Sequence, residues 1–135
     1  MGEYIKGILV GESGVGKTTF VLRGKDVLSA AESTVTPGCY NFDFSETDVE
    51  FQIWDTAGQE QYRTLTKQYY HDSLIVFAFT VMSSDQNEVE KYDEAFCFYI
   101  NQAIEYISND FNFAFIINKI DGFSQPEIYE REEYI

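Results

Sequence analysis

The chain has 135 residues and a formal net charge of −14 at pH 7, and 44% of its residues are hydrophobic. This length is enough to bury a core, and the acidic balance argues against nucleic-acid binding and against electrostatic attachment to an anionic membrane. No apolar run approaches the roughly 20 residues of a membrane-spanning helix, no signal-peptide pattern is present, and Cys39 and Cys97 lack metal or redox spacing. We therefore expect one compact domain with reduced cysteines.

Hydrophobic periodicity predicts strands and helices that follow one another without repeats or an internal linker. The predicted elements, in chain order, are a strand at 4–10, a helix from 17 to about 24, a long loop at 26–38, a hairpin formed by 39–45 and 49–54, a buried parallel strand at 74–81, a helix within 87–110, a strand at 111–117 and a helix from 127 onward. The segment between 87 and 110 carries an apolar stripe that predicts a core-facing side, made of Tyr92, Ala95, Phe96, Tyr99, Ile100, Ala103, Ile104 and Ile107.

The first predicted strand leads into a segment that fits the pattern G-x-x-x-x-G-K-[ST] at every fixed position, from Gly11 to Thr18. Its glycines let the backbone wrap so that N–H groups point at a polyphosphate, and the next helix adds its positive dipole end. Lys17 supplies a charge for the outer phosphates, and the Thr18 hydroxyl is a candidate magnesium ligand. The segment therefore predicts a nucleoside-triphosphate site; on this motif alone, a ligand-free glycine-rich turn is the alternative.

The second strand of the predicted hairpin leads into residues 54–60, which read WDTAGQE. Side chains alternate along this strand, which places Asp55 at its end. From there the carboxylate can reach the magnesium shell, and Gly58 can offer a backbone N–H to a terminal phosphate. In isolation this segment could also be an ordinary turn.

A third motif, Asn118-Lys119-Ile120-Asp121, follows the apolar run at 113–117. An aspartate in that place can accept hydrogen bonds from the N1–H and the exocyclic amine of guanine. Adenine presents the opposite pattern on that edge, so Asp121 would reject it by leaving buried polar groups unpaired. The three motifs together predict a guanine-nucleotide site.

With these three motifs in this order, the chain resembles the small GTPases of the Ras superfamily, and residues 54–66, continuing to Tyr69-Tyr70, are most similar to the switch II segment of the Rab branch. The resemblance implies an α/β fold of three layers, with a doubly wound, mostly parallel sheet and the nucleotide at the carboxyl ends of its strands. It implies GTP or GDP and Mg²⁺ as ligands. The residues that it implies for the nucleotide are Ser13, Gly14, Val15, Gly16, Lys17, Thr18, Thr19, Gly58, Asn118, Lys119 and Asp121, and those for magnesium are Thr18, Thr36 and Asp55.

The resemblance also implies two switch loops. Thr36 lies where the family has its switch I threonine, with Thr34 as the competing candidate, and the Pro after Thr36 is unusual for the family. Thr36 and Gly58 would hold both loops on a triphosphate, and hydrolysis would release them. Gln59 would orient the attacking water, and hydrolysis should be slow because no arginine finger in cis is evident. The implied catalytic residues are Gln59, Lys17 and Thr36.

Three serines stand where the family pattern has other residues. Ser29 and Ser33 occupy positions where small GTPases usually carry aromatic side chains that stack on guanine and close over the phosphates, which predicts weaker affinity or looser switching. Ser13 stands where Ras has a glycine tied to hydrolysis, but Rab proteins commonly have small polar residues there.

The chain ends fourteen residues after Asp121, whereas the family continues through a further strand, a guanine-contacting loop, a final helix and a prenylated tail. We expect residues 1–135 to form a single small GTPase domain that is incomplete at its carboxyl end, as either a truncated form or a naturally short variant. An uncovered sheet edge and apolar face predict self-association or pairing with a partner, weaker nucleotide retention and no membrane anchor in this chain.

Two functions remain open from the sequence. The first is a GTPase switch of vesicle traffic, regulated by exchange factors and GTPase-activating proteins and read by effectors. The second is a pseudo-GTPase that serves as an interaction module with little turnover. Asp121 disfavours a third class, a P-loop ATPase or kinase. For either function we expect a cytoplasmic protein, with a full-length form on the cytosolic face of endomembranes.

Overall fold

The computed structural model describes residues 3–28, 30–32, 38–43, 48–56 and 67–135. Within these ranges the chain forms a sheet of six strands in the order β2-β3-β4-β1-β5-β6. The strands are β1 (Glu3–Val10), β2 (Ala30–Glu32), β3 (Cys39–Asp43), β4 (Val49–Asp55), β5 (Ile75–Val81) and β6 (Asn112–Asn118), and the helices are α1 (Lys17–Leu28), α2 (Lys67–Tyr70), α3 (Gln86–Tyr106) and α4 (Gln125–Tyr134). Strands β4, β1, β5 and β6 run parallel, and β2 and β3 add an antiparallel edge.

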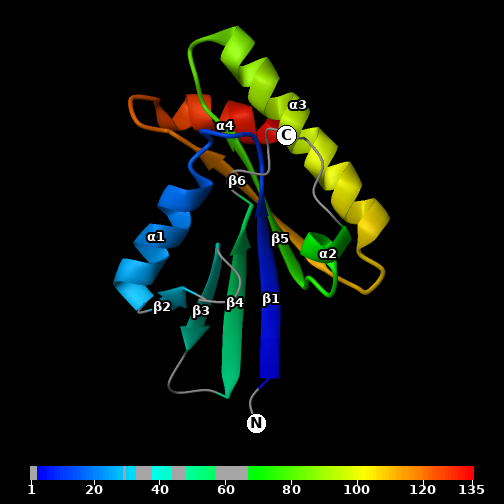
Figure 1. The fold of residues 1–135 in the computed structure, drawn as a ribbon. Coiled ribbons are helices and arrows are strands. Elements are labelled where there is room, and N and C mark those ends of the chain that lie inside the picture. The colour runs from blue at the N-terminus through cyan, green and yellow to red at the C-terminus, as the bar shows by residue number, and fades with distance from the viewer. Residues whose placement is uncertain (1–2, 29, 33–37, 44–47, 57–66) are drawn as a thin grey trace.

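Helices cover both faces of this sheet, as Figure 1 shows with α1 on one side and α3 on the other. The register explains the two layers, because Ile8 pairs with Val76 and Leu9 with Phe77, so that neighbouring strands present the same face at each level. Ile8 lies in a core cluster with α3, and Leu9 lies in a second cluster with Val21 of α1. The predicted doubly wound α/β fold is therefore confirmed.

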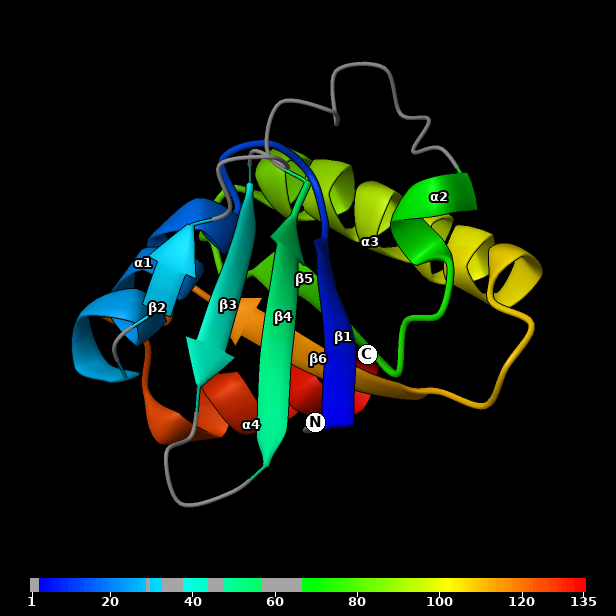
Figure 2. The same cartoon turned by 60° about the horizontal axis from the view of Figure 1, so that its bottom comes forward.

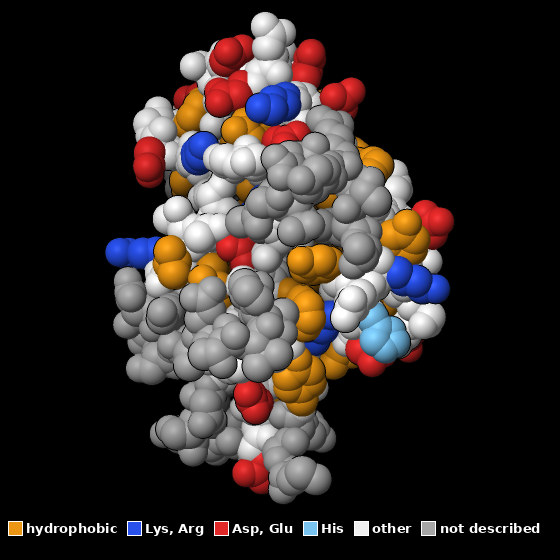
Figure 3. Space-filling model, in the orientation of Figure 1, with side chains coloured by type: hydrophobic (Ala, Val, Ile, Leu, Met, Phe, Trp, Pro, Cys, Tyr) orange, Lys and Arg blue, Asp and Glu red, His pale blue; other side chains and the backbone are white. Residues whose placement is uncertain are grey.

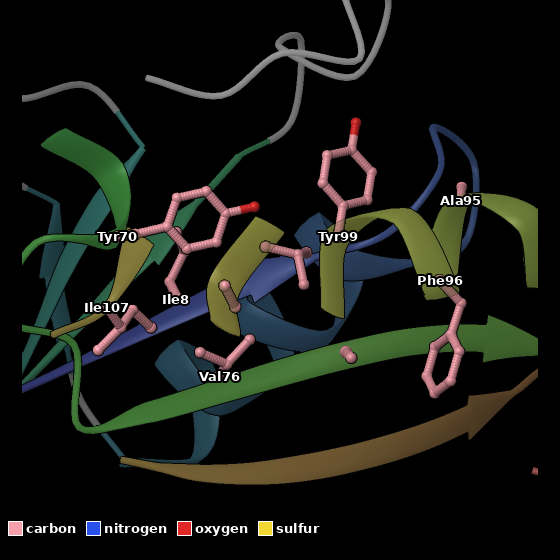
Figure 4. Packing of buried hydrophobic residues seen from close by; sticks show 10 residues of the cluster. Ile8, Tyr70, Val76, Ala95, Phe96, Tyr99 and Ile107 are labelled. Carbon is pink, nitrogen blue, oxygen red and sulfur yellow. The ribbon is translucent and has the colours of Figure 1, made fainter. Parts of the chain in front are cut away.

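The core beneath α3 is rich in aromatic side chains (Figure 4). Tyr70 of α2 is fully buried, and its hydroxyl donates a hydrogen bond to Oε1 of Gln102 at 2.7 Å. Burial raises the pKa of Tyr70 well above its usual range, so the hydroxyl stays neutral. This bond fixes the short helix α2 against the much longer α3.

The predicted apolar stripe of α3 is confirmed in most of its length and wrong at Ile104, which is 60% exposed. The helix meets the sheet along the line of Ala95, Tyr99 and Ala103. Since each residue turns about 100° around the helix axis, Ile104 points away from Ala103 and toward solvent. A periodic pattern alone cannot show where the covered sector ends.

The predicted loop at 26–38 is wrong in part, because α1 continues to Leu28 and residues 30–32 form β2. Gly24, where the helix was expected to end, lies inside α1, and a Cβ there would meet the ring of Phe42 at 3.5 Å. This is an ordinary van der Waals distance, and it marks where α1 packs on β3. Strand β2 forms by pairing with β3, with Ala30 opposite Phe42, and this long-range contact leaves no local pattern.

The surface is strongly acidic over the first half of α3, where Figure 3 shows acidic side chains at the top of the molecule. Glu88, Glu90 and Glu94 are all exposed there. Among the helices that the structure describes, none is both long and apolar enough to cross a lipid bilayer.

Candidate nucleotide-binding site

The three predicted motifs meet at one edge of the sheet. Strands β4, β1, β5 and β6 pair in parallel, so their carboxyl ends point the same way (Figures 1 and 2). The loop at 11–16 follows β1, Asp55 ends β4, and Asn118 ends β6. This is the edge at which ligands bind in sheets of this kind.

Residues 11–16, the predicted phosphate loop, fold around the side chain of Lys17. That side chain is buried, and its Nζ donates hydrogen bonds to the carbonyl oxygens of Gly11 and Glu12 at 3.0 and 3.1 Å. The backbone N–H of Val15 donates to the same Glu12 carbonyl at 3.3 Å. The loop is thereby closed into a turn that holds a positive charge at the start of α1.

Two glycines are required by this turn. Gly14 and Gly16 have φ angles of 84° and 104°, which side-chain-bearing residues rarely adopt. A Cβ on Gly16 would also collide with Nδ2 of Asn118, and one on Gly14 would lie 3.2 Å from the hydroxyl of Tyr92. Both the backbone and the neighbouring side chains therefore exclude larger residues.

The two predicted magnesium ligands that the structure describes are in contact. The hydroxyl of Thr18 donates to Oδ2 of Asp55 at 2.6 Å. The end of β4 is fixed by two further bonds, from the Thr56 hydroxyl to the Leu9 carbonyl at 2.7 Å and from the Asp55 N–H to the Gly38 carbonyl at 2.7 Å. A hydroxyl and a carboxylate are the hard oxygen ligands that Mg²⁺ prefers, so this pair fits the ion.

The predicted base-recognition motif is bonded directly to the phosphate loop. Nδ2 of Asn118 donates to the Val15 carbonyl at 3.0 Å, and Nζ of Lys119 donates to the Gly14 carbonyl at 2.6 Å. Met82 joins the ends of β5 and β6, because its N–H donates to the Asn118 carbonyl at 2.9 Å. Asp121 is exposed just beyond this junction, so its carboxylate can be reached by a ligand.

The remaining predicted site residues divide into two groups. Ser13 and Thr19 are exposed beside the phosphate loop, and the Ser13 N–H donates to the carboxylate of Glu12 at 3.0 Å. Thr36, Gly58 and Gln59 lie outside the described residues, as do Ser29, Ser33 and Thr34, so their roles stay predictions.

Tyr92 lies beside Gly14, and Lys6 contacts Trp54, which precedes Asp55 in the sequence; neither was singled out as a site residue. Lys6, on β1, is 6% exposed, and its Nζ donates to the carbonyls of Gln68 and His71 at 3.2 and 3.0 Å while lying 4.1 Å from the ring centre of Trp54. Burial lowers the pKa of Lys6 to about 8. The alternating pattern of β1 gives no sign that Lys6, a polar residue, faces inward. Tyr92 was predicted to be a core residue, and only the fold shows that its hydroxyl end lies beside Gly14.

Comparison with known proteins gives a consistent result. A family model described as the Ras family matches residues 6–133. The chain is 32% identical to Ras-related protein Rab-26 of Rattus norvegicus over 95% of its own length and 49% of that protein. It is 40% identical to GTP-binding protein YPTM1 of Zea mays over 68% of its length and 48% of that protein, and 34% identical to Ras-related protein RABD2c of Arabidopsis thaliana over 93% and 62%. The chain thus spans about half the length of the first two relatives.

Proposed function

The chain belongs to the Ras family, near its Rab branch, and on that premise we propose that it binds GDP and GTP with Mg²⁺ and hydrolyses GTP slowly. The observation that carries this proposal is the pair of hydrogen bonds from Asn118 and Lys119 to the phosphate loop. They join a base-recognition segment to a phosphate-binding segment in one rigid unit. Asp121, exposed next to that unit, supplies the acceptor that guanine needs.

Thr18 and Asp55 would hold the magnesium ion, and a bound Mg²⁺ supplies charge that stabilises the phosphates during transfer. Lys17 already lies within the loop, where its ammonium can exchange a carbonyl partner for a phosphate oxygen. The chain's own contribution is therefore mainly positioning and charge, as phosphoryl transfer requires.

For the switch residues we keep the roles that the family resemblance implies. Gln59 orients the attacking water, and Thr36 and Gly58 bind the terminal phosphate and are released on hydrolysis. We propose that effectors, exchange factors and GTPase-activating proteins read this change, in a role in vesicle traffic. Ser29 and Ser33 favour the second candidate, an interaction module with little turnover, because aromatic closure over the nucleotide is missing at those positions.

Two variants test the chemistry. Gln59→Leu should slow single-turnover GTP hydrolysis by at least about tenfold and leave GTP binding nearly unchanged, because the loss falls on the transition state. Lys17→Ala should abolish binding itself, because a charge inside the phosphate loop is lost. Both are measured by phosphate release and by fluorescent-nucleotide titration, with Arg23→Met as a control at an exposed site on α1. Equal hydrolysis by Gln59→Leu and the unmodified chain would refute the role of Gln59 and favour the interaction module.

A further inference from the structure

We propose that Tyr92 is a positioning residue for nucleotide binding, which holds Gly14 of the phosphate loop and Lys119 of the base-recognition motif in one arrangement. This inference rests on the proposed function of the site. It concerns a residue of α3 that belongs to none of the three motifs.

The ring of Tyr92 is fixed by the core. The residue is 6% exposed and belongs to the cluster that contains Leu9 of β1, Val15 of the phosphate loop and Phe79 of β5. Its Cβ is held by α3, a helix of 21 residues. The side chain is therefore a rigid support that extends from the core to the loop.

The hydroxyl end of Tyr92 lies against the phosphate loop. It is 3.2 Å from the place that a Cβ on Gly14 would occupy, so a side chain at residue 14 would press on the hydroxyl. Burial, together with the charges of Glu88 and Glu12, raises the pKa of Tyr92. The hydroxyl thus stays neutral and adds no negative charge to a site for phosphates.

The face of the ring lies near Lys119. Nζ of Lys119 is 5.9 Å from the ring centre, within the range of a cation–π interaction, and the same ammonium donates to the Gly14 carbonyl at 2.6 Å. Lys119 therefore bonds to Gly14 and lies over the ring of Tyr92, whose hydroxyl end lies beside Gly14. Lys91 lies 5.6 Å from the same ring and adds a second positive charge.

This arrangement of Tyr92, Gly14 and Lys119 would reduce the conformational entropy that is lost when the nucleotide binds. The Lys119 side chain is exposed, and a free lysine side chain loses much conformational entropy when it is immobilised. The ring of Tyr92 and the Gly14 carbonyl restrict it before a ligand arrives, while the hydroxyl limits movement of the Gly14 peptide. Pre-organisation of this kind acts on residence time more than on association rate.

The test is a double-mutant cycle on GDP dissociation from the Mg²⁺-loaded chain. Tyr92→Leu should raise the dissociation rate about fivefold, the effect of a cation–π contact of ordinary strength, and Tyr92→Phe should give a smaller rise because the ring is kept. Lys119→Met should cost less in the Tyr92→Leu background than in the unmodified chain. Tyr106→Leu is the matched control, since Tyr106 lies on the same helix but packs on Tyr70.

If Tyr92 only stabilised the fold, its replacement would not change the effect of Lys119→Met on GDP dissociation. Additive effects of Tyr92→Leu and Lys119→Met on the dissociation free energy would therefore overturn the inference. Hydrogen exchange of the nucleotide-free chain tests the role of Tyr92 independently of the proposed function. Amides of residues 13–16 should exchange faster in Tyr92→Leu than in Tyr106→Leu. Equal exchange in the two variants would also refute the inference that Tyr92 restricts this loop. Failure of the unmodified chain to bind GDP would instead refute the proposed function, whatever the exchange experiment shows.

Discussion

A buried lysine joins three elements next to the site. The ammonium of Lys6 donates to the carbonyls of Gln68 in α2 and of His71 just after it, and lies over the ring of Trp54, one residue before Asp55. Residues 57–66, which carry the predicted Gly58 and Gln59, lie between these anchor points in the sequence. Lys6 therefore connects β1 to β4 and to the region of α2, although it contacts none of the predicted ligands.

The protonation of Lys6 should make stability depend on pH. Burial lowers its folded pKa from 10.5 to about 8, opposed by the negative charge of Asp72. Between these values the unfolded chain binds the proton and the folded chain has lost it, so the free energy of unfolding contributed by Lys6 rises with pH. We expect the unmodified chain to gain stability relative to Lys6→Arg from pH 7.5 to pH 9.5 in urea denaturation, because arginine keeps its proton.

The comparison with Lys6→Arg reduces the effect of Cys39, because this thiol, whose pKa burial raises to about 11, is present in both chains. Parallel stability profiles, or a fall of the unmodified chain relative to the variant, would contradict this account of Lys6.

Single residues were predictable where local spacing carries the chemistry. Lys17, Thr18, Asp55 and Asn118 were assigned to one site from motifs, and the fold brings them together. Lys6 and Tyr92 could not be assigned, because an inward-facing lysine or a core tyrosine acquires its polar partners only through packing against distant elements.

At the scale of elements, α4 is held to the sheet by a polar contact. None of its residues is fully buried, but Arg131 donates to the Val81 carbonyl at 3.2 Å and to the Thr80 hydroxyl at 3.2 Å, and forms a salt bridge with Asp93 of α3. The Thr80 hydroxyl also donates to Asp93 at 2.6 Å. One side chain thus connects α4, α3 and β5.

Removing that side chain should release α4. We expect Arg131→Met to lower the free energy of unfolding by about 2 kcal/mol, since Asp93 and the Val81 carbonyl lose a charged donor in a poorly solvated place. Hydrogen exchange of residues 127–134 should accelerate, whereas Arg23→Met, which removes an exposed arginine from α1, should change neither quantity. Unchanged exchange in α4 would show that other contacts hold the helix.

The start of α4 was predictable and its docking was not. The prediction of a helix from 127 onward, after Pro126, lies within two residues of its true start. The structure adds a capping box formed by Ser124 and Glu127, a local signal that the prediction did not use. Strand β2 and helix α2 escaped prediction because they are three and four residues long. Elements of that length depend on their neighbours for stability.

At the scale of the whole molecule, two cores on opposite faces of one sheet position three loops at a single edge. The core under α3 contains Ile8 and Val76, and the core under α1 contains Leu9 and Phe79, so adjacent residues of each strand serve different layers. The sheet fixes the positions of the phosphate loop, the end of β4 and the end of β6. Its parallel strands therefore determine the site.

The outer strand β6 gives the predicted self-association its physical basis. None of the β6 residues is fully buried, and Phe115 is 52% exposed although its ring stacks on Phe113 and packs against Phe96. Exposed aromatic side chains on a strand of this kind favour association. Self-association itself stays a prediction.

The central claim is that the edge formed by these loops selects guanine, and a competition titration tests it most directly. GTP should displace a fluorescent guanine nucleotide from the unmodified chain more than about a hundredfold better than ATP. Asp121 accepts hydrogen bonds from the donors of guanine, whereas adenine leaves this carboxylate unpaired. In Asp121→Asn the preference should move from guanine toward xanthine, since the donor and acceptor roles are exchanged. Equal displacement by ATP and GTP from the unmodified chain would contradict the account.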